Sequence, residues 1–150
     1  MISLFLMLNF TLAFGQTDIK LVKVKNYSFI EISPEILIKF LNQTMEEWVD
    51  LMNKNGYEEM DNSDGIITHS KGNLEERIQA IAKNKLGIVS ITWLDNGKTS
   101  MIQQIQKKVE KSFLNKANNI SYYTYGKYII GLESTRGNDC VLETVYIKRQ

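Results

Sequence analysis

The residues that could do acid–base chemistry are few, and His69 comes first because it is the chain's only histidine. It lies in the segment IITHSKG, near the end of an expected strand, with Ser70 directly after it and Ser63 a few residues upstream. A serine nucleophile needs a base, an orienting carboxylate and an oxyanion site, and neither serine stands in a G-x-S-x-G turn. We therefore predict no catalytic residue and expect His69 to lie on the surface or at a strand end.

Two further motifs fail for metal and nucleotide chemistry. The stretch from Asp61 to Gly65 carries two acidic residues, but Ser63 stands where an EF-hand loop needs Asp or Asn, and no Glu occupies its twelfth position. The segment NGKTS lacks the first glycine of a phosphate-binding loop. We predict a hairpin turn over residues 61–65 and neither a metal site nor a cofactor.

A tyrosine-rich segment, YYTYGKY, is the one compositional feature above background. It contains Tyr122, Tyr123, Tyr125 and Tyr128. Tyrosine is favoured in strands, and it is also favoured in recognition surfaces, where it supplies contact area at little entropic cost. In one strand Tyr123 and Tyr125 share a face while Tyr122 points to the other. We propose these four tyrosines as a binding site, with core and cross-strand packing as the alternative.

Charge and composition exclude some classes of partner. The chain has 18 Lys and Arg against 17 Asp and Glu, a net charge of +1, whereas a nucleic-acid binder needs a basic excess or stripe. The nearest stripe, KLVKVK, reads as a solvated strand or an N-terminal arm. With 43% hydrophobic residues and one proline, the chain is expected to fold rather than to be disordered. The expected partner is an unknown protein or small ligand, and not a nucleic acid.

The opening segment predicts a signal peptide. Residues Ile2 to Phe14 form a mostly apolar segment without a charged residue, which is too short for a membrane-spanning helix but typical of a signal-peptide core. Ala13 and Gly15 fit a small-x-small cleavage site, so residues 1–15 are expected to be a signal peptide and residues 16–150 one mature domain, exported to the periplasm or outside the cell. No stable membrane anchor would remain after cleavage. The alternative is a buried N-terminal strand or helix. The segment lacks the Lys or Arg with which signal peptides usually begin.

Cysteine usage does not decide the compartment, because Cys140 is the only cysteine and cannot form a bridge within the chain. It lies in an alternating segment, DCVLETVYIKR, which is expected to be a strand, and we expect it to be buried there as a small apolar residue rather than reactive.

Helical signals occur in two regions. Ser33 and Pro34 form a cap and a first helical position, and apolar residues recur at spacings of three and four through about residue 55. Thr44 and Glu47 form a capping box inside this region, so it is either one helix or two with a break near residues 42–43. A second helix is expected over about residues 102–113, with Phe113 on its apolar face.

The rest of the chain reads as strands and turns, with expected turns at 61–65, at 71–73 and at 134–139. Residues 74–83 fit a strand or a helix. An apparent αβββ duplication favours the strand. The prediction is an α+β two-layer sandwich, in which an antiparallel sheet of about six to seven strands carries two main helices on one face.

These observations indicate an exported small globular protein, with a non-enzymatic binding or interaction domain expected. Two alternatives stay open: a small exported hydrolase that uses His69, and an inhibitor or immunity-type protein that caps an enzyme with a surface of one charge sign.

Overall fold

The structure is a computed structural model and describes residues 18–73, 77–95, 101–137 and 140–150. Within them the chain forms, in order, β1 (Leu21–Val24), β2 (Tyr27–Ile30), α1 (Pro34–Asn42), α2 (Met45–Lys54), β3 (Glu58–Ser63), β4 (Ile66–Asn73), β5 (Arg77–Asn84), β6 (Ile88–Asp95), α3 (Met101–Val109), the 3-10 turn η1 (Glu110–Ser112), β7 (Phe113–Ala117), β8 (Ile120–Tyr125), β9 (Tyr128–Arg136) and β10 (Val141–Arg149). An eight-stranded antiparallel sheet has the order β3-β4-β5-β6-β10-β9-β8-β7, and β1 and β2 pair separately.

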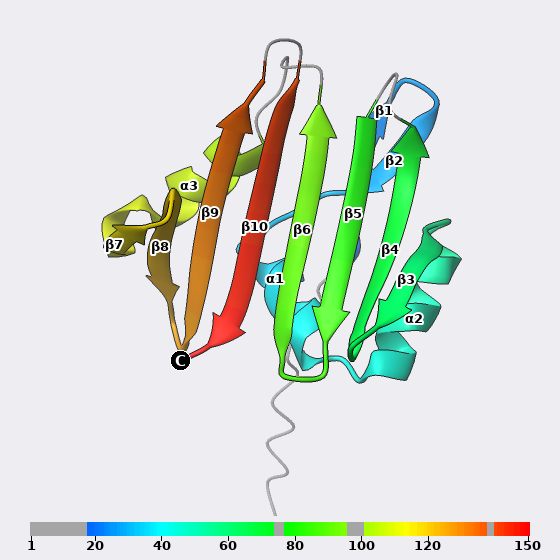
Figure 1. Ribbon diagram of the computed structural model, residues 1–150, viewed down its shortest axis with the longest axis horizontal. Coiled ribbons are helices and arrows are strands. Elements are labelled where there is room, and N and C mark those ends of the chain that lie inside the picture. Colours follow the sequence, from blue (N-terminus) through cyan, green and yellow to red (C-terminus); the bar gives the residue numbers. More distant parts are fainter. Residues whose placement is uncertain (1–17, 74–76, 96–100, 138–139) are drawn as a thin grey trace, which may run out of the picture.

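The three α-helices lie on one face of the large sheet, behind it in the view of Figure 1. The β1–β2 hairpin lies on the same side, where the Phe29 ring is 5.2 Å from the Trp93 ring. The fold is α+β, as predicted, with a larger sheet than the six to seven strands expected and with three helices in place of two main ones.

The break between α1 and α2 is present where the capping box predicts it. The Ser33 side chain accepts a hydrogen bond from the Ile36 backbone N–H at 3.3 Å, and Pro34 occupies the first turn. Thr44 accepts from the Glu47 backbone N–H at 3.2 Å, and the Glu47 carboxylate accepts from the Thr44 N–H at 2.8 Å. Each cap satisfies amide donors that a helix end leaves without a partner inside the helix.

The second helical region is shorter than predicted. Helix α3 ends at Val109, a 3-10 turn follows, and Phe113 begins strand β7 with 55% of its surface exposed. The Ser112 hydroxyl donates to the Val109 carbonyl at 2.7 Å, and it also donates to the Thr124 carbonyl of β8. A side chain that bonds to the backbone in this way competes with continuation of the helix. The prediction that Phe113 lies on the apolar face of this helix is therefore wrong.

Two predicted turns lie partly inside strands. Strand β3 runs through Asp61, and the turn itself is Asp64–Gly65, both at positive φ, as the two central residues of a type I′ hairpin turn must be. The predicted turn at 71–73 is the end of β4. There a Cβ on Gly72 would lie 1.9 Å from the Arg77 carbonyl oxygen, so only glycine fits.

Residues 77–83 of the ambiguous segment belong to strand β5, whose side chains alternate between buried and half-buried. Residues 74–76 lie outside the described residues, as do residues 138–139 of the predicted turn at 134–139, of which 134–136 belong to β9. Cys140 is exposed, so the prediction that it is buried is wrong: it precedes β10 and does not take part in the strand's alternation.

No helix in the described ranges is long and apolar enough to cross a membrane. The predicted signal peptide, residues 1–15, lies outside the part of the chain that the structure describes.

Candidate functional site: the open face of the sheet

The sheet has two faces of different character, and the helix-covered face is the core. Its apolar centre includes Ile81, Ile91 and Val145, each with no exposed surface. Buried polar side chains also point from the sheet into this layer. They are His69, Arg77, Gln79, Lys83 and Glu143.

Gln79 joins the sheet to β2. Its amide donates to the Ile30 carbonyl at 3.1 Å, and its carbonyl accepts from the Tyr57 hydroxyl. That hydroxyl also accepts from the Ile30 backbone N–H at 2.9 Å. Burial raises the pKa of Tyr57, so the hydroxyl keeps its proton as a donor. A buried amide that donates at its nitrogen and accepts at its oxygen fixes the position of β2 against the sheet.

Lys83 and Glu143 hold the helices. The Lys83 ammonium donates to the Phe40 and Gln43 carbonyls at the carboxyl end of α1, where helix carbonyls lack internal partners. The Glu143 carboxylate accepts from the Ile102 backbone N–H at 3.1 Å, near the amino end of α3. Burial lowers the pKa of Lys83. Both charges are therefore structural.

A partly exposed network ties α1 to α3 and β8. The Tyr125 hydroxyl donates to Glu35 at 2.7 Å, and the Lys108 ammonium lies 3.4 Å from the other carboxylate oxygen. Burial alone would raise the pKa of Glu35, but hydrogen bonds from Ser33 and Tyr125 and the charge of Lys108 outweigh it and lower the pKa to about 2.

His69 lies in the core and not on the surface. It has no exposed surface, and its ring meets the Trp48 ring edge-on at 5.1 Å. Neither ring nitrogen has a hydrogen-bond partner in the part of the chain that the structure describes. Ser63 bonds instead to the Asp61 carboxylate at 2.9 Å. The geometry of a serine–histidine pair is absent from the described residues, and the expectation of a surface or strand-end His69 does not match its burial.

The four proposed tyrosines do not form one surface. Tyr123 and Tyr128 are buried on the covered face, and Tyr125 is half-buried there through its bond to Glu35. The Tyr123 hydroxyl accepts from the Gln106 amide at 3.5 Å, and the Tyr128 hydroxyl accepts from the Asn42 amide at the same distance. Tyr122 alone lies on the opposite face, where its ring packs on Gly131.

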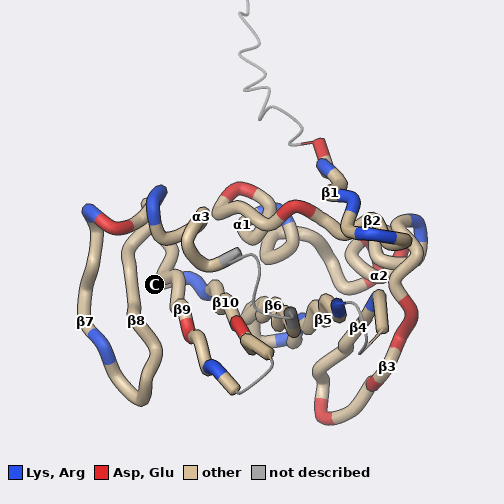
Figure 2. The backbone as a smooth tube through the Cα atoms, turned by 90° about the horizontal axis from the view of Figure 1, so that it is seen from above, with Lys and Arg blue, Asp and Glu red and all other residues tan. Residues whose placement is uncertain are grey.

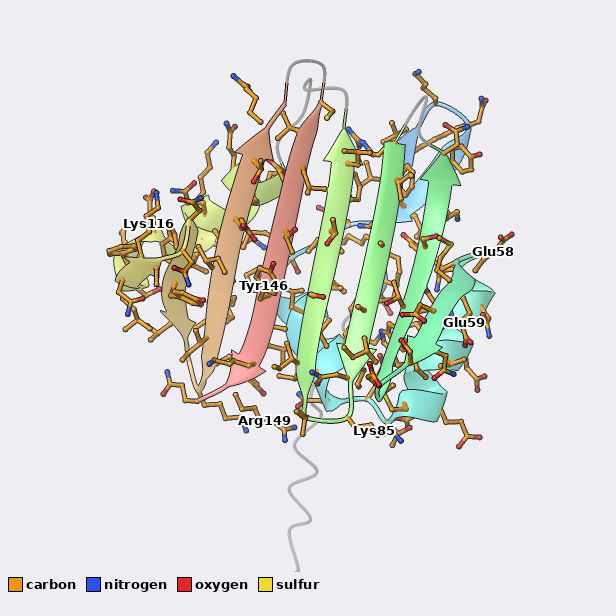
Figure 3. All side chains as sticks on the ribbon, viewed as in Figure 1. Glu58, Glu59, Lys85, Lys116, Tyr146 and Arg149 are labelled. Atoms are coloured by element: carbon orange, nitrogen blue, oxygen red, sulfur yellow. The ribbon has the colours of Figure 1, made fainter. Side chains whose placement is uncertain are left out.

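That opposite face, which we call the open face, carries no helix (Figure 3), and most of its side chains are uncharged. The pairing register gives one row of residues across six strands: Thr68, Ala82, Ser90, Tyr146, Gly131 and Tyr122. A second row is Ser70, Ala80, Thr92, Thr144 and Glu133. A third is Gly72, Ile78, Leu94, Leu142 and Thr135.

Tyr146 stands near the centre of the open face (Figure 3). Its hydroxyl donates to the Glu133 carboxylate at 3.0 Å, and burial together with that bond raises its pKa. Leu142 and Ile88 are 41% and 37% exposed. A sheet face that is exposed to water normally carries many charged and polar side chains. A face this poor in charge is therefore a candidate contact surface.

Sequence reasoning missed these residues, although a signal existed. The segments RIQAIAKN and IVSITWL alternate without placing charges on either face within their central residues. Strands without charged residues on either face are typical of a sheet that is covered on both sides.

Charge gathers at the two sheet edges (Figure 2). Between Met45 and Ile66 the chain has seven acidic residues and one lysine, and all seven acids are exposed. Between Ile102 and Ile129 it has five exposed lysines and one glutamate. The β3 edge is therefore acidic and the β7 edge is basic.

Two cavities adjoin β8. One, of about 220 Å³, opens on the open face beside Tyr122, Ile129 and Lys148. The other, of about 200 Å³, lies beside α3 and is lined by Gln106, Ser121, Ser134 and Lys116, with Tyr123 at its wall. No group of three metal-ligating side chains occurs among the described residues.

Comparison of the chain with protein-family models, curated proteins and solved structures finds no match.

Proposed function

We propose that this protein is an exported, non-enzymatic binding or interaction domain, and that the open face is its binding surface. The observation that carries the proposal is the composition of that face: one row without a charged residue crosses six strands, Glu133 and Lys148 are the charged residues of the adjoining rows, and no helix covers them. Exposed apolar sheet surface is costly in water, and it becomes favourable when a partner buries it.

The buried polar groups on the covered face support a binding role rather than a catalytic one, because most of them hold neighbouring elements in place. Gln79, Lys83 and Glu143 are each bonded to a neighbouring element, and buried His69 has no hydroxyl or carboxylate within hydrogen-bond reach among the described residues. The hydrolase alternative therefore has no supporting geometry. We also propose that the chain is an internal repeat, since each half is helix followed by a four-stranded meander and the halves join through β6 and β10.

The test of the binding surface is capture of partners from the exported fraction of the source organism by the full chain and two variants. Ala82→Arg places a charge at the centre of the open face, and Gln104→Arg adds the same charge on exposed α3. We expect the captured protein to be lost with Ala82→Arg and kept with Gln104→Arg. Equal capture by both variants would refute the open face as the binding surface.

Export is tested separately. N-terminal sequencing of the protein from its own host, after fractionation, should give a chain that begins at Gln16 in an exported fraction. An intact Met1 in the cytosol would overturn the proposed localisation.

One alternative retains a specific observation in its favour. An inhibitor or immunity-type protein would present a surface of one charge sign to a basic enzyme site, and the exposed acids of α2 and β3 form such a surface. Replacing Glu58 and Asp61 by lysine would abolish partner capture in that case, and Ala82→Arg on the open face would leave it unchanged.

A further inference from the structure

We infer that the occupant of the open face is a second copy of this chain, packed face to face about a two-fold axis that runs parallel to the strands. This inference rests on the proposed function of the open face as a protein-binding surface. Three properties of that face lead to it: the distribution of side-chain size, the distribution of charge, and area.

Side-chain size divides the row that crosses six strands into two halves, whereas the third row carries large residues in both, Ile78 and Leu94 in one and Leu142 in the other. In the row that crosses six strands, the β4–β6 half presents Thr68, Ala82 and Ser90, while the β8–β10 half presents Tyr146 and Tyr122 on either side of Gly131. The small half leaves space, and the two rings of the other half stand above the sheet.

A two-fold axis parallel to the strands, between β6 and β10, places each half over the other. Tyr146 of one copy then lies over Ser90 of the other, and Tyr122 lies over Thr68 of the other. Large side chains that face small ones let two layers interdigitate, which is the requirement for close packing. A two-fold axis across the strands would instead place the tyrosine half over itself.

The charges select the same axis. It brings β3 of each copy over β7 of the other, so the acidic edge meets the edge that bears Lys111 and Lys116. The alternative axis would set Glu58 and Asp61 of one copy near the same carboxylates of the other, and like charges at an interface disfavour association.

The available area is sufficient. Six strands at a spacing of about 4.8 Å, each about 8 residues long, give roughly 800 Å² per copy. That is about the area each partner contributes to a standard protein interface. Sheets of the same twist pack face to face with their strands about 30° apart, so two copies need no rearrangement.

The test is sedimentation equilibrium of the full chain over a range of concentrations, with Cys140→Ser throughout to exclude an intermolecular disulfide at this exposed thiol. We expect a monomer–dimer equilibrium. Ala82→Arg should raise the dissociation constant at least about 30-fold, as expected for a charge at an interface centre, and Gln104→Arg should leave it unchanged. If Ala82→Arg does not fold, Ile88→Arg on the same face takes its place.

Glu133→Gln provides a test of opposite sign. The carboxylate becomes buried against the other copy, while a glutamine still accepts from the Tyr146 hydroxyl, so the variant should dimerise about tenfold more tightly. A merely structural role for Glu133 would not strengthen association.

Spin labels at Ser63→Cys on β3 decide the axis. The inferred axis separates the two labels by roughly 34 Å, seven strand spacings, whereas the alternative axis brings them to about 22 Å, because Ser63 lies about 10 Å from the centre of the face along the strands and packed sheets are about 10 Å apart. A monomer at all concentrations, a dimer unaffected by the open-face charge, or the short label distance would each overturn the inference. If the protein is a monomer whose partner capture is still lost with Ala82→Arg, the second copy is excluded and the proposed function stands.

Discussion

The two faces of the eight-stranded sheet differ in how their polar side chains are used. On the covered face, polar side chains are buried, and most are used: Gln79 holds β2, Lys83 holds the end of α1, and Glu143 holds the start of α3. On the open face, small neutral side chains such as Ala82, Ser90 and Thr92 have no layer above them. The covered face is distinguished by its internal hydrogen bonds, and the open face by its small number of charged side chains.

This contrast predicts that side chains on the covered face contribute more to the free energy of unfolding than side chains on the open face. Ile91→Ala on the covered face should lower the free energy of unfolding by about 2–5 kcal/mol, because the side chain is fully buried and a cavity remains. Ile78→Ala on the open face should cost less than about 1 kcal/mol in dilute solution, because Ile78 is only half-buried. Denaturant unfolding at two protein concentrations checks both values. If the open face is an interface, the cost of Ile78→Ala should rise with concentration; equal costs for both variants in dilute solution would contradict the division between faces.

The next largest effect tests the buried polar anchors. Lys83→Met keeps the apolar stem and removes the ammonium, so the carbonyls of Phe40 and Gln43 lose their donor inside the core. We expect a loss of about 1–3 kcal/mol in the free energy of unfolding. The matched control is Lys85→Met in the exposed β5–β6 turn, which should change it by less than about 0.5 kcal/mol. Equal stability of the two variants would remove Lys83 as an anchor of α1.

His69 should make the covered face sensitive to acid. Burial lowers the pKa of His69 below its ordinary 6.5, although the charge of Glu59 opposes this. Because the unfolded chain takes up the proton first as pH falls, stability is complete above about pH 6.5 and decreases below it, by at most about 1.4 kcal/mol per pH unit, until the folded-state pKa is reached. Urea unfolding between pH 7.5 and 5 checks this. His69→Phe, which keeps a ring against Trp48, should remove this part of the pH dependence, and an unchanged slope in that variant would contradict the assignment.

The smallest effect concerns the Glu35 network at the margin of the covered face. With the pKa of Glu35 at about 2, the ionised carboxylate stabilises the fold above about pH 4.5, and that contribution is lost as pH falls toward 2. Since the side chain is 43% exposed, solvent screening keeps the contribution below about 1 kcal/mol. Tyr125→Phe should raise the pKa of Glu35, as followed by NMR titration of its carboxyl carbon. An unchanged pKa would exclude Tyr125 as a cause.

Much of the covered face could be predicted from the sequence. Caps depend on neighbours in the chain, so Ser33, Thr44 and Glu47 located the helix starts correctly. The β5 segment stayed ambiguous because its apolar residues fit both periods. Long-range partners decided it: Gln79 and Lys83 are tolerated inside because backbone groups from 49 and 43 residues away receive their hydrogen bonds.

The open face could not be predicted in the same way. Its rows depend on strand register, and three of the four tyrosines of the tyrosine-rich segment point to the covered face, so this segment does not mark the open face. Cys140 and Phe113 were misplaced for a related reason: each stands directly before or at the first residue of a strand, where alternation does not yet determine exposure.

Hydroxyl-radical footprinting over a range of protein concentrations tests the central claim, that the open face packs against a second copy of this chain, most directly. The claim predicts that oxidation of Leu142, Ile88 and Tyr146 on the open face slows as concentration rises. Leu86, which lies in the β5–β6 turn and is 88% exposed, should react at a constant rate. Oxidation of the open-face residues that stays as independent of concentration as that of Leu86, up to the highest attainable concentration, would contradict self-association through this face.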